Sequence, residues 1–175
     1  MQEIIYRELN AADLYEYRRI RLESLANYPD HFGATYDEEF HSSASRLEPV
    51  VKNQLKNSFA IGAFVSVDKL VGICGFLAEQ QSKKKHRGEI VQFYVDPAHA
   101  RKGIGKNLLK LCVQKTSDFK IEQIVLSATS TNDCAINLYK KLGFVQYGRL
   151  DHYFRSPSGY HTQLLFVLNK LKQVI

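Results

Sequence analysis

The stretch that most constrains the fold runs from Gly88 to Leu109 and reads as a strand, a glycine-containing turn and a helix. Alternation predicts a strand over 89–95, and Asp96-Pro97 ends it because proline has no amide donor for a sheet ladder. Helical spacing of apolar residues predicts a helix after the turn, through Ile104, Leu108, Leu109, Leu111 and Cys112. Such a turn presents unpaired backbone N–H groups beside the positive end of a helix, which suits a phosphate or pyrophosphate.

The glycines of the turn, Gly103 and Gly105, do not identify a nucleotide-binding motif by themselves. A Walker P-loop needs Ser or Thr where Asn107 stands, and a first glycine where Ala100 stands. A Rossmann fingerprint would place its third glycine at Leu108. Both motifs fit the sequence poorly.

Two segments in a fixed order resemble the acetyl-CoA motifs of the GNAT superfamily of N-acetyltransferases. The first is Val95-Asp96-Pro97 followed by Gly103, Gly105 and the pair Leu108-Leu109, with Ala100 where the family usually has Gln or Arg. The second is the run 132–144, which resembles the family pattern N-x-x-A-x-x-L-Y-x-x-x-G-[FY]. The resemblance covers residues 60–168 well and the part before Ser58 only loosely.

The order of the predicted elements and the resemblance both indicate one mixed α/β domain over residues 1–175. Strands are predicted at 3–9, 58–67, 70–81, 89–95, 121–128, 144–154 and 160–168. Helices are predicted at 10–26, 45–57, 104–117 and 132–142, and an acidic, aromatic segment occupies 36–40. We expect the GNAT-type acyl-CoA transferase fold, a mixed, mostly antiparallel sheet of about seven strands with helices on both faces.

The net charge of +6 agrees with a polyanionic cofactor, and it agrees equally with nucleic-acid binding. The densest basic block, 83–87, is interpreted as a solvated loop, because no aromatic reading face or helix-turn-helix accompanies it. We therefore expect no nucleic-acid partner. No apolar run approaches the ~18–20 residues of a membrane span, so a cytoplasmic protein without a membrane segment is expected.

The three cysteines, Cys74, Cys112 and Cys134, form no C-x-x-C pair. Their odd number and spacing argue against a disulfide framework or a zinc site, and no bound metal is expected. Each cysteine is predicted to pack as a small apolar residue.

The resemblance implies transfer of an acetyl group from acetyl-CoA, a co-substrate, to a primary amine of a small molecule or peptide. It places the pyrophosphate on the turn, and the pantetheine arm where the strand splays from its neighbour, with the Phe93 N–H polarising the thioester carbonyl. Arg101, Lys102 and Lys106 lie at a helix start, where positive charge is unfavourable unless an anion is bound. Their presence therefore favours a bound pyrophosphate at the turn. The implied cofactor-binding residues are Phe93, Tyr94, Val95, Arg101, Lys102, Gly103, Ile104, Gly105, Lys106, Asn132, Ala135 and Tyr139.

Tyr139 is the residue that the resemblance implies as the acid for the departing thiolate. It shares a helix face with Asn132 and Ala135. The competing interpretation places Tyr139 in an apolar stripe with Leu138 and Leu142.

Glu89 is the candidate catalytic base. Strict alternation places it on one strand face with Val91, Phe93 and Val95, where partial burial would raise its pKa toward ~7. It would lie about 13 Å from Phe93 along a regular strand, so a bulge or a water relay is required. A surface glutamate at a strand end is the competing interpretation.

The amine acceptor is not fixed by the sequence. The acidic segment could attract a cationic amine, with tyrosines shaping its pocket, although a solvated acidic loop is the competing interpretation; the residues are Tyr36, Asp37, Glu38, Glu39, Tyr153 and Tyr160. A non-catalytic acyl-CoA-binding regulatory module is the alternative function, against which the presence of Tyr139 and both turn glycines argues. A homodimer through an edge strand is compatible with the pattern.

Overall fold

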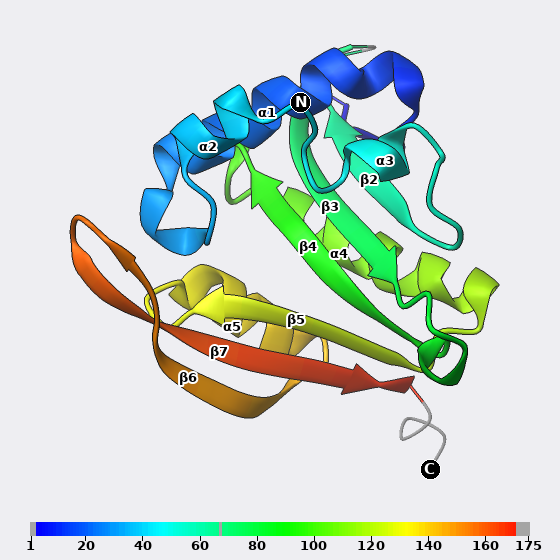
Figure 1. Ribbon diagram of the computed structural model, residues 1–175. Coiled ribbons are helices and arrows are strands. Elements are labelled where there is room, and N and C mark those ends of the chain that lie inside the picture. Colours follow the sequence, from blue (N-terminus) through cyan, green and yellow to red (C-terminus); the bar gives the residue numbers. More distant parts are fainter. Residues whose placement is uncertain (1–2, 67, 171–175) are drawn as a thin grey trace.

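The computed structural model describes residues 3–66 and 68–170. One seven-stranded sheet has the order β1-β2-β3-β4-β5-β7-β6, and only the β4–β5 pair is parallel (Figure 1). The strands are β1 (Ile5–Glu8), β2 (Phe59–Phe64), β3 (Leu70–Ala78), β4 (Arg87–Val95), β5 (Gln123–Thr129), β6 (Val145–Ser156) and β7 (Gly159–Asn169). The α-helices are α1 (Leu14–Asn27), α2 (Tyr36–His41), α3 (Glu48–Val51), α4 (Ile104–Lys115) and α5 (Asp133–Lys141). The predicted mixed, mostly antiparallel sheet is confirmed.

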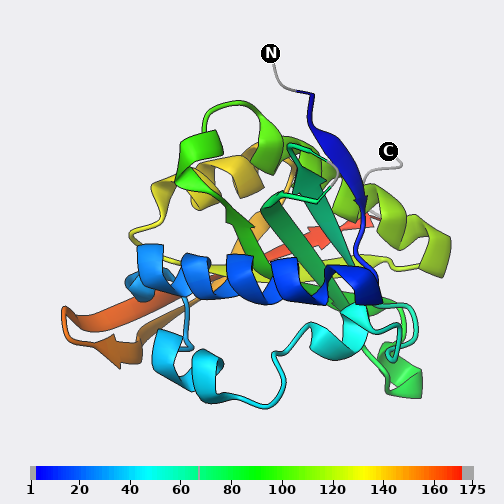
Figure 2. The ribbon, with the colours of Figure 1, turned by 90° about the horizontal axis from the view of Figure 1, so that it is seen from above.

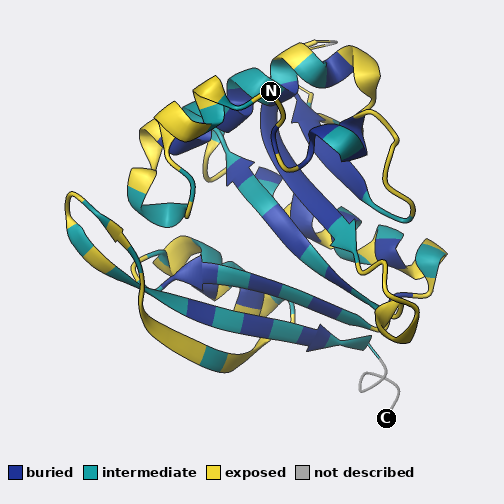
Figure 3. Ribbon diagram, in the orientation of Figure 1, coloured by how far each residue is buried: buried dark blue, intermediate teal, exposed yellow. Residues whose placement is uncertain are grey.

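Helices cover both faces of the sheet, as predicted. On one face, α4 and α5 bury Leu108 and Ile136 in the larger hydrophobic cluster. On the other face, α1 lies across the strands (Figure 2) and buries Tyr17 and Ile20, together with Val51 of α3. Strands β2 and β3 are buried along nearly their whole length, whereas the edge strand β6 is mostly exposed (Figure 3).

The predicted helix at 45–57 is wrong in extent, because α3 is a single turn. Pro49 occupies its start, and the chain leaves helical geometry at Asn53 and Asn57, which both have positive φ. The acidic segment instead forms α2, whose first turn carries a capping box between Thr35 and Glu38. Strand β2 is also shorter than predicted, and Val67, the last residue of that prediction, lies outside the described residues.

Strand β4 contains a β-bulge that the alternation pattern did not predict. Gln92 has a φ of 50°, and Gln92 and Phe93 together stand opposite a single residue of β3, Cys74. Val91 therefore packs in the α1-side cluster, whereas Phe93 packs against the α4-side cluster. The prediction that Glu89, Val91, Phe93 and Val95 share one face is wrong, because the extra residue reverses the alternation.

The cysteines differ in environment. Cys74 and Cys112 are buried beside each other in the α4-side cluster, as predicted, but Cys134 is exposed in the first turn of α5. Within residues 3–66 and 68–170, no three His, Cys, Asp or Glu side chains gather as a metal site. None of the helices described there is long and apolar enough to cross a bilayer.

Candidate active site

Strands β4 and β5 part after a short parallel pairing. Their ladder joins Arg87–Glu89 to Gln123–Val125, and beyond it β4 stays with β3 while β5 stays with β7 (Figure 1). The N–H of Asp96 donates to Val71 of β3 at 2.8 Å. Because N–H groups alternate sides along a strand, Val95 directs its N–H toward the side from which β5 has withdrawn.

The first of two cavities at this parting has a volume of about 560 Å³ and lies between the carboxyl end of β4, the glycine turn and the start of α5. It brings together most of the predicted cofactor-binding residues: Phe93, Tyr94, Val95, Arg101, Gly103, Ile104, Gly105, Lys106, Asn132 and Ala135. Lys102 is exposed and does not line this cavity, and Tyr139 lines the second one. We call the first cavity the cofactor-side cavity.

The glycine turn has the geometry of an anion cradle. Gly103 caps α4 with a φ of 78° and without any side-chain hydrogen bond. The amides of Ile104, Gly105 and Lys106 have no acceptor within the described part of the chain. A Cβ on Gly105 would lie 3.3 Å from the Phe93 ring, so glycine avoids crowding this wall of the cofactor-side cavity. Free amides at a helix start, with Arg101 and Lys106 beside them, fit a diphosphate.

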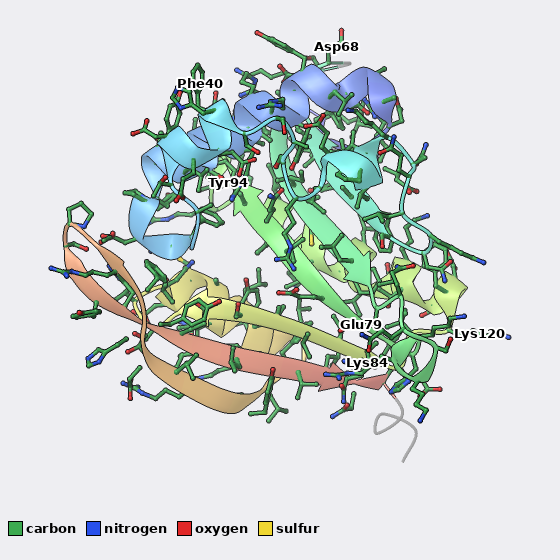
Figure 4. The ribbon with its side chains drawn as sticks, viewed as in Figure 1. Phe40, Asp68, Glu79, Lys84, Tyr94 and Lys120 are labelled. Atoms are coloured by element: carbon green, nitrogen blue, oxygen red, sulfur yellow. The ribbon has the colours of Figure 1, made fainter. Side chains whose placement is uncertain are left out.

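Tyr94 lies at the end of β4, on the side of α1 (Figure 4). Its ring is 5% exposed in the α1-side cluster, and its hydroxyl accepts a hydrogen bond from Nδ2 of Asn27 at 3.0 Å. Burial raises the pKa of this phenol. The side chain of Tyr94 therefore anchors the end of β4 to α1.

The second cavity, of about 500 Å³, adjoins the first across β4, and we call it the acceptor-side cavity. Five residues line both: His31, Phe32, Phe93, Asn132 and Ala135. The acceptor-side cavity is closed by Tyr139 of α5, by Gln163 of β7 and by Tyr153 of β6. A group bound between β4 and β5 would thus be reachable from both sides.

Tyr139 packs in the core, as the apolar interpretation predicts, and it also lines the acceptor-side cavity. It is 4% exposed, and its ring contacts those of Phe93, Phe144 and Phe166 at centroid distances of 5.8 to 6.2 Å. Its hydroxyl makes no hydrogen bond to the described residues, although the side chain lines the acceptor-side cavity. Burial, with a smaller contribution from Cys74, raises the pKa of Tyr139, so the phenol keeps its proton.

Glu89 lines the acceptor-side cavity and forms an ion pair with Arg46, at 2.6 Å. Its side chain is 40% exposed, so it is partly buried, as predicted. A bulge lies at Gln92 and Phe93, between Glu89 and the end of the strand. Asn132 accepts a hydrogen bond from the Ala135 amide at 3.2 Å, so it caps α5 while lining both cavities.

Arg21 was missed as a site residue, whereas its partner Glu39 was one of the acceptor-site candidates. Arg21 of α1 lines the acceptor-side cavity and pairs with Glu39 of α2 at 3.2 Å. Of the acidic segment only Glu39 reaches this cavity, and of its candidate tyrosines only Tyr153 does. The signal in the sequence was an arginine within the buried stripe of α1, between Tyr17 and Leu25.

A model of the acetyltransferase (GNAT) family matches residues 14–144. The chain belongs to this family. Among GNAT relatives, N-alpha-acetyltransferase 30 of Dictyostelium discoideum is 36% identical over 101 residues, which are 58% of this chain and 54% of that protein. Spermine/spermidine N(1)-acetyltransferase of Bacillus subtilis is 35% identical over 72 residues, 41% of this chain and 47% of that protein. The chain thus spans about half the length of these curated relatives, or less.

The fold is that of solved GNAT structures. The acetyltransferase of the GNAT family from Streptococcus pneumoniae superimposes with a TM-score of 0.83 at 21% identity, over 95% of this chain and 99% of that chain. A probable acetyltransferase from Staphylococcus epidermidis gives a TM-score of 0.78 at 19% identity, over 95% and 99%.

The backbone conformation of the glycine turn predicts a stability effect. Gly103→Ala lowers the free energy of unfolding by about 1–2 kcal/mol, because alanine is strained at a φ of 78° although nothing lies within 4 Å of its Cβ. Gly33→Ala, where the Cβ also meets nothing and φ is not positive, is the matched control and costs no stability. Urea denaturation measures both, and equal effects would contradict the role assigned to the Gly103 backbone.

Proposed function

We propose that the protein transfers an acetyl group from acetyl-CoA to a primary amine. The observation that carries the proposal is the parting of β4 from β5, with an anion cradle at one end and a second cavity behind it. The GNAT family membership supports this reaction, since its members use acetyl-CoA as co-substrate in general. Relatives named for peptide N-terminal and for polyamine acetylation are compatible with amines of either class.

The cofactor-side residues fit acetyl-CoA. The free amides of 104–106 would bind the diphosphate, and the side chains of Arg101 and Lys106 would add positive charge. Bound there, acetyl-CoA supplies the activated acetyl group. The Phe93 N–H would donate to the thioester oxygen and stabilise the negative charge that develops on it.

Three proton transfers complete the reaction, because the nitrogen loses two protons and the sulfur gains one. Tyr139 would donate its phenolic proton to the departing sulfur. Burial raises the pKa of Tyr139 and keeps the phenol protonated, and burial of the departing sulfur disfavours its thiolate form, which favours proton transfer to the sulfur. Glu89 would accept the proton of the acceptor ammonium, with Arg46 holding the carboxylate in the cavity wall. The second nitrogen proton, released as the amide forms, would return to Tyr139 and restore its phenol.

Binding of acetyl-CoA is the first test of this function. We expect acetyl-CoA to raise the melting temperature of the protein, and a panel of primary amines to include acceptors that release free CoA thiol. Gly105→Val should weaken binding at least tenfold, because its side chain crowds this wall of the cofactor-side cavity. Lys110→Ala, an exposed change on the same helix, should leave binding unaltered. An unaltered melting temperature with acetyl-CoA would overturn the proposed function.

Tyr139→Phe separates chemistry from binding. The ring packing is kept and the lost hydroxyl has no partner among the described residues, so thermal stability and acetyl-CoA affinity should be unchanged. Turnover should fall about 100-fold or more if the phenol donates the proton. The measurements are steady-state kcat and acetyl-CoA affinity, for Tyr139→Phe and for the wild type. Full turnover in the variant would remove this role from Tyr139 and leave the binding proposal intact.

Glu89→Gln tests the proposed base. A base must be deprotonated to act, so kcat/KM of the wild type should fall toward acid pH. The variant cannot lose a proton at this position, so its acidic limb should shift and its maximal rate should drop. A pH profile identical to that of the wild type would discard the role. Glu23→Gln, an ion-paired glutamate of α1 outside both cavities, is the control.

A further inference from the structure

The buried ion pair between Arg21 and Glu39 is incompletely hydrogen-bonded. Their side chains are 8% and 10% exposed, and a single contact, from Nε to Oε2 at 3.2 Å, joins them. A guanidinium can hold a carboxylate through two parallel hydrogen bonds, but this pair does not. Nη1 of Arg21 and Oε1 of Glu39 are both buried without a partner within the described part of the chain. Both side chains line the acceptor-side cavity, so a charged donor and a charged acceptor remain without a partner in two of its lining residues.

The pair lies next to the place where the two cavities meet. The guanidinium of Arg21 stacks over the ring of Phe32, with its central carbon 5.1 Å from the ring centroid. Phe32 lines both cavities, and so does the neighbouring His31. If the amine of an acceptor reaches the parted strands, the groups next to that amine would therefore lie beside Arg21 and Glu39.

The charges of the acceptor-side cavity are already matched. Its two glutamates each pair with an arginine, Glu39 with Arg21 and Glu89 with Arg46, so the four formal charges sum to zero. Burial lowers the pKa of His31, which favours its neutral form near pH 7. A polyamine would bring further ammonium groups, and the cavity offers them no carboxylate without an arginine attached.

A neutral group that both donates and accepts hydrogen bonds is the better match. It satisfies Oε1 and Nη1 together and adds no charge to a buried site. In an extended peptide the N–H and C=O of one residue point to the same side, as they do in a hydrogen-bonded pair of antiparallel strands. The second residue of a peptide presents these groups one step behind the reactive α-amine.

We propose that Arg21 and Glu39 recognise the backbone C=O and N–H of the second residue of a peptide acceptor, so that the protein acetylates a peptide α-amine and not a polyamine. This inference rests on the proposed acetyl transfer. Arg21 would donate to the carbonyl oxygen and Glu39 would accept from the N–H. Both residues thus determine the acceptor and take no part in the transfer itself.

The test compares three acceptors on the wild type: a free-amine tripeptide, the same tripeptide N-methylated at its second residue, and spermidine. Release of CoA thiol measures kcat/KM for each. We expect the tripeptide to exceed spermidine at least tenfold. N-methylation removes a hydrogen bond to a charged group, so it should lower kcat/KM about tenfold or more, chiefly by raising KM.

Glu39→Gln completes the test. Its amide oxygen is expected to face Arg21 and its NH₂ the acceptor, so the variant cannot accept from the peptide N–H. N-methylation should then change kcat/KM less than twofold. Glu23→Gln, whose ion pair with Arg19 lies outside the acceptor-side cavity, should keep the full wild-type response.

The outcomes separate the two proposals. The inference would be overturned if N-methylation lowered kcat/KM by the same factor in the wild type and in Glu39→Gln. A steric effect of the methyl group would be common to both proteins, so only a lost hydrogen bond to Glu39 makes them differ. Spermidine as the better acceptor would also overturn it and leave acetyl transfer standing. Absence of thermal stabilisation by acetyl-CoA, with no thiol released from any acceptor, would overturn both proposals. The comparison of acceptors on the wild type needs no mutation, so it tests the inference even if Glu39→Gln folds poorly.

Discussion

The site depends on one parallel pairing that stops after three residue pairs. Up to Glu89 and Val125 the sheet is continuous, and beyond them β4 and β5 follow different neighbours. Backbone N–H groups inside a domain are costly to leave unpaired, so strand edges that part need a ligand or water to satisfy them. The exposed edge of β4 is therefore suited to binding a ligand through its backbone. The glycine turn that follows directly places an anion cradle at the end of this same edge.

The bulge in β4 links this edge to the first helix. Gln92 adopts a φ of 50°, a conformation that costs of order 1–3 kcal/mol for a residue other than glycine. Its side chain accepts a hydrogen bond from the fully buried Tyr17 at 2.9 Å, and the Tyr17 hydroxyl also contacts Ser45. These bonds offset the local strain and fix which side chains of β4 face each cavity. Helix α1 thereby supports the site from the opposite face of the sheet.

The sequence allowed the sheet and the cofactor side to be predicted because both follow from local pattern. Alternating or β-rich runs bounded by turn residues located the strands, and the two segments that resemble the family motifs located the glycine turn and the start of α5. The bulge escaped prediction because nothing in a run of alternating residues marks one extra residue. The length of α3 escaped because the left-handed turns at Asn53 and Asn57 depend on local conformations that polar residues adopt only in context.

The two sides of the site differ in what builds them, and this explains why their predictability differs. The cofactor side relies largely on backbone atoms whose positions a short motif determines, so replacing the usual Gln or Arg by Ala100 removes a side chain and keeps the amides. The acceptor side relies on side chains from distant elements, such as Arg21, Glu39, Glu89 and Tyr153, which only the tertiary fold brings together. Proteins that share the motif can therefore bind the same co-substrate and still differ in acceptor, because separate parts of the chain determine the two.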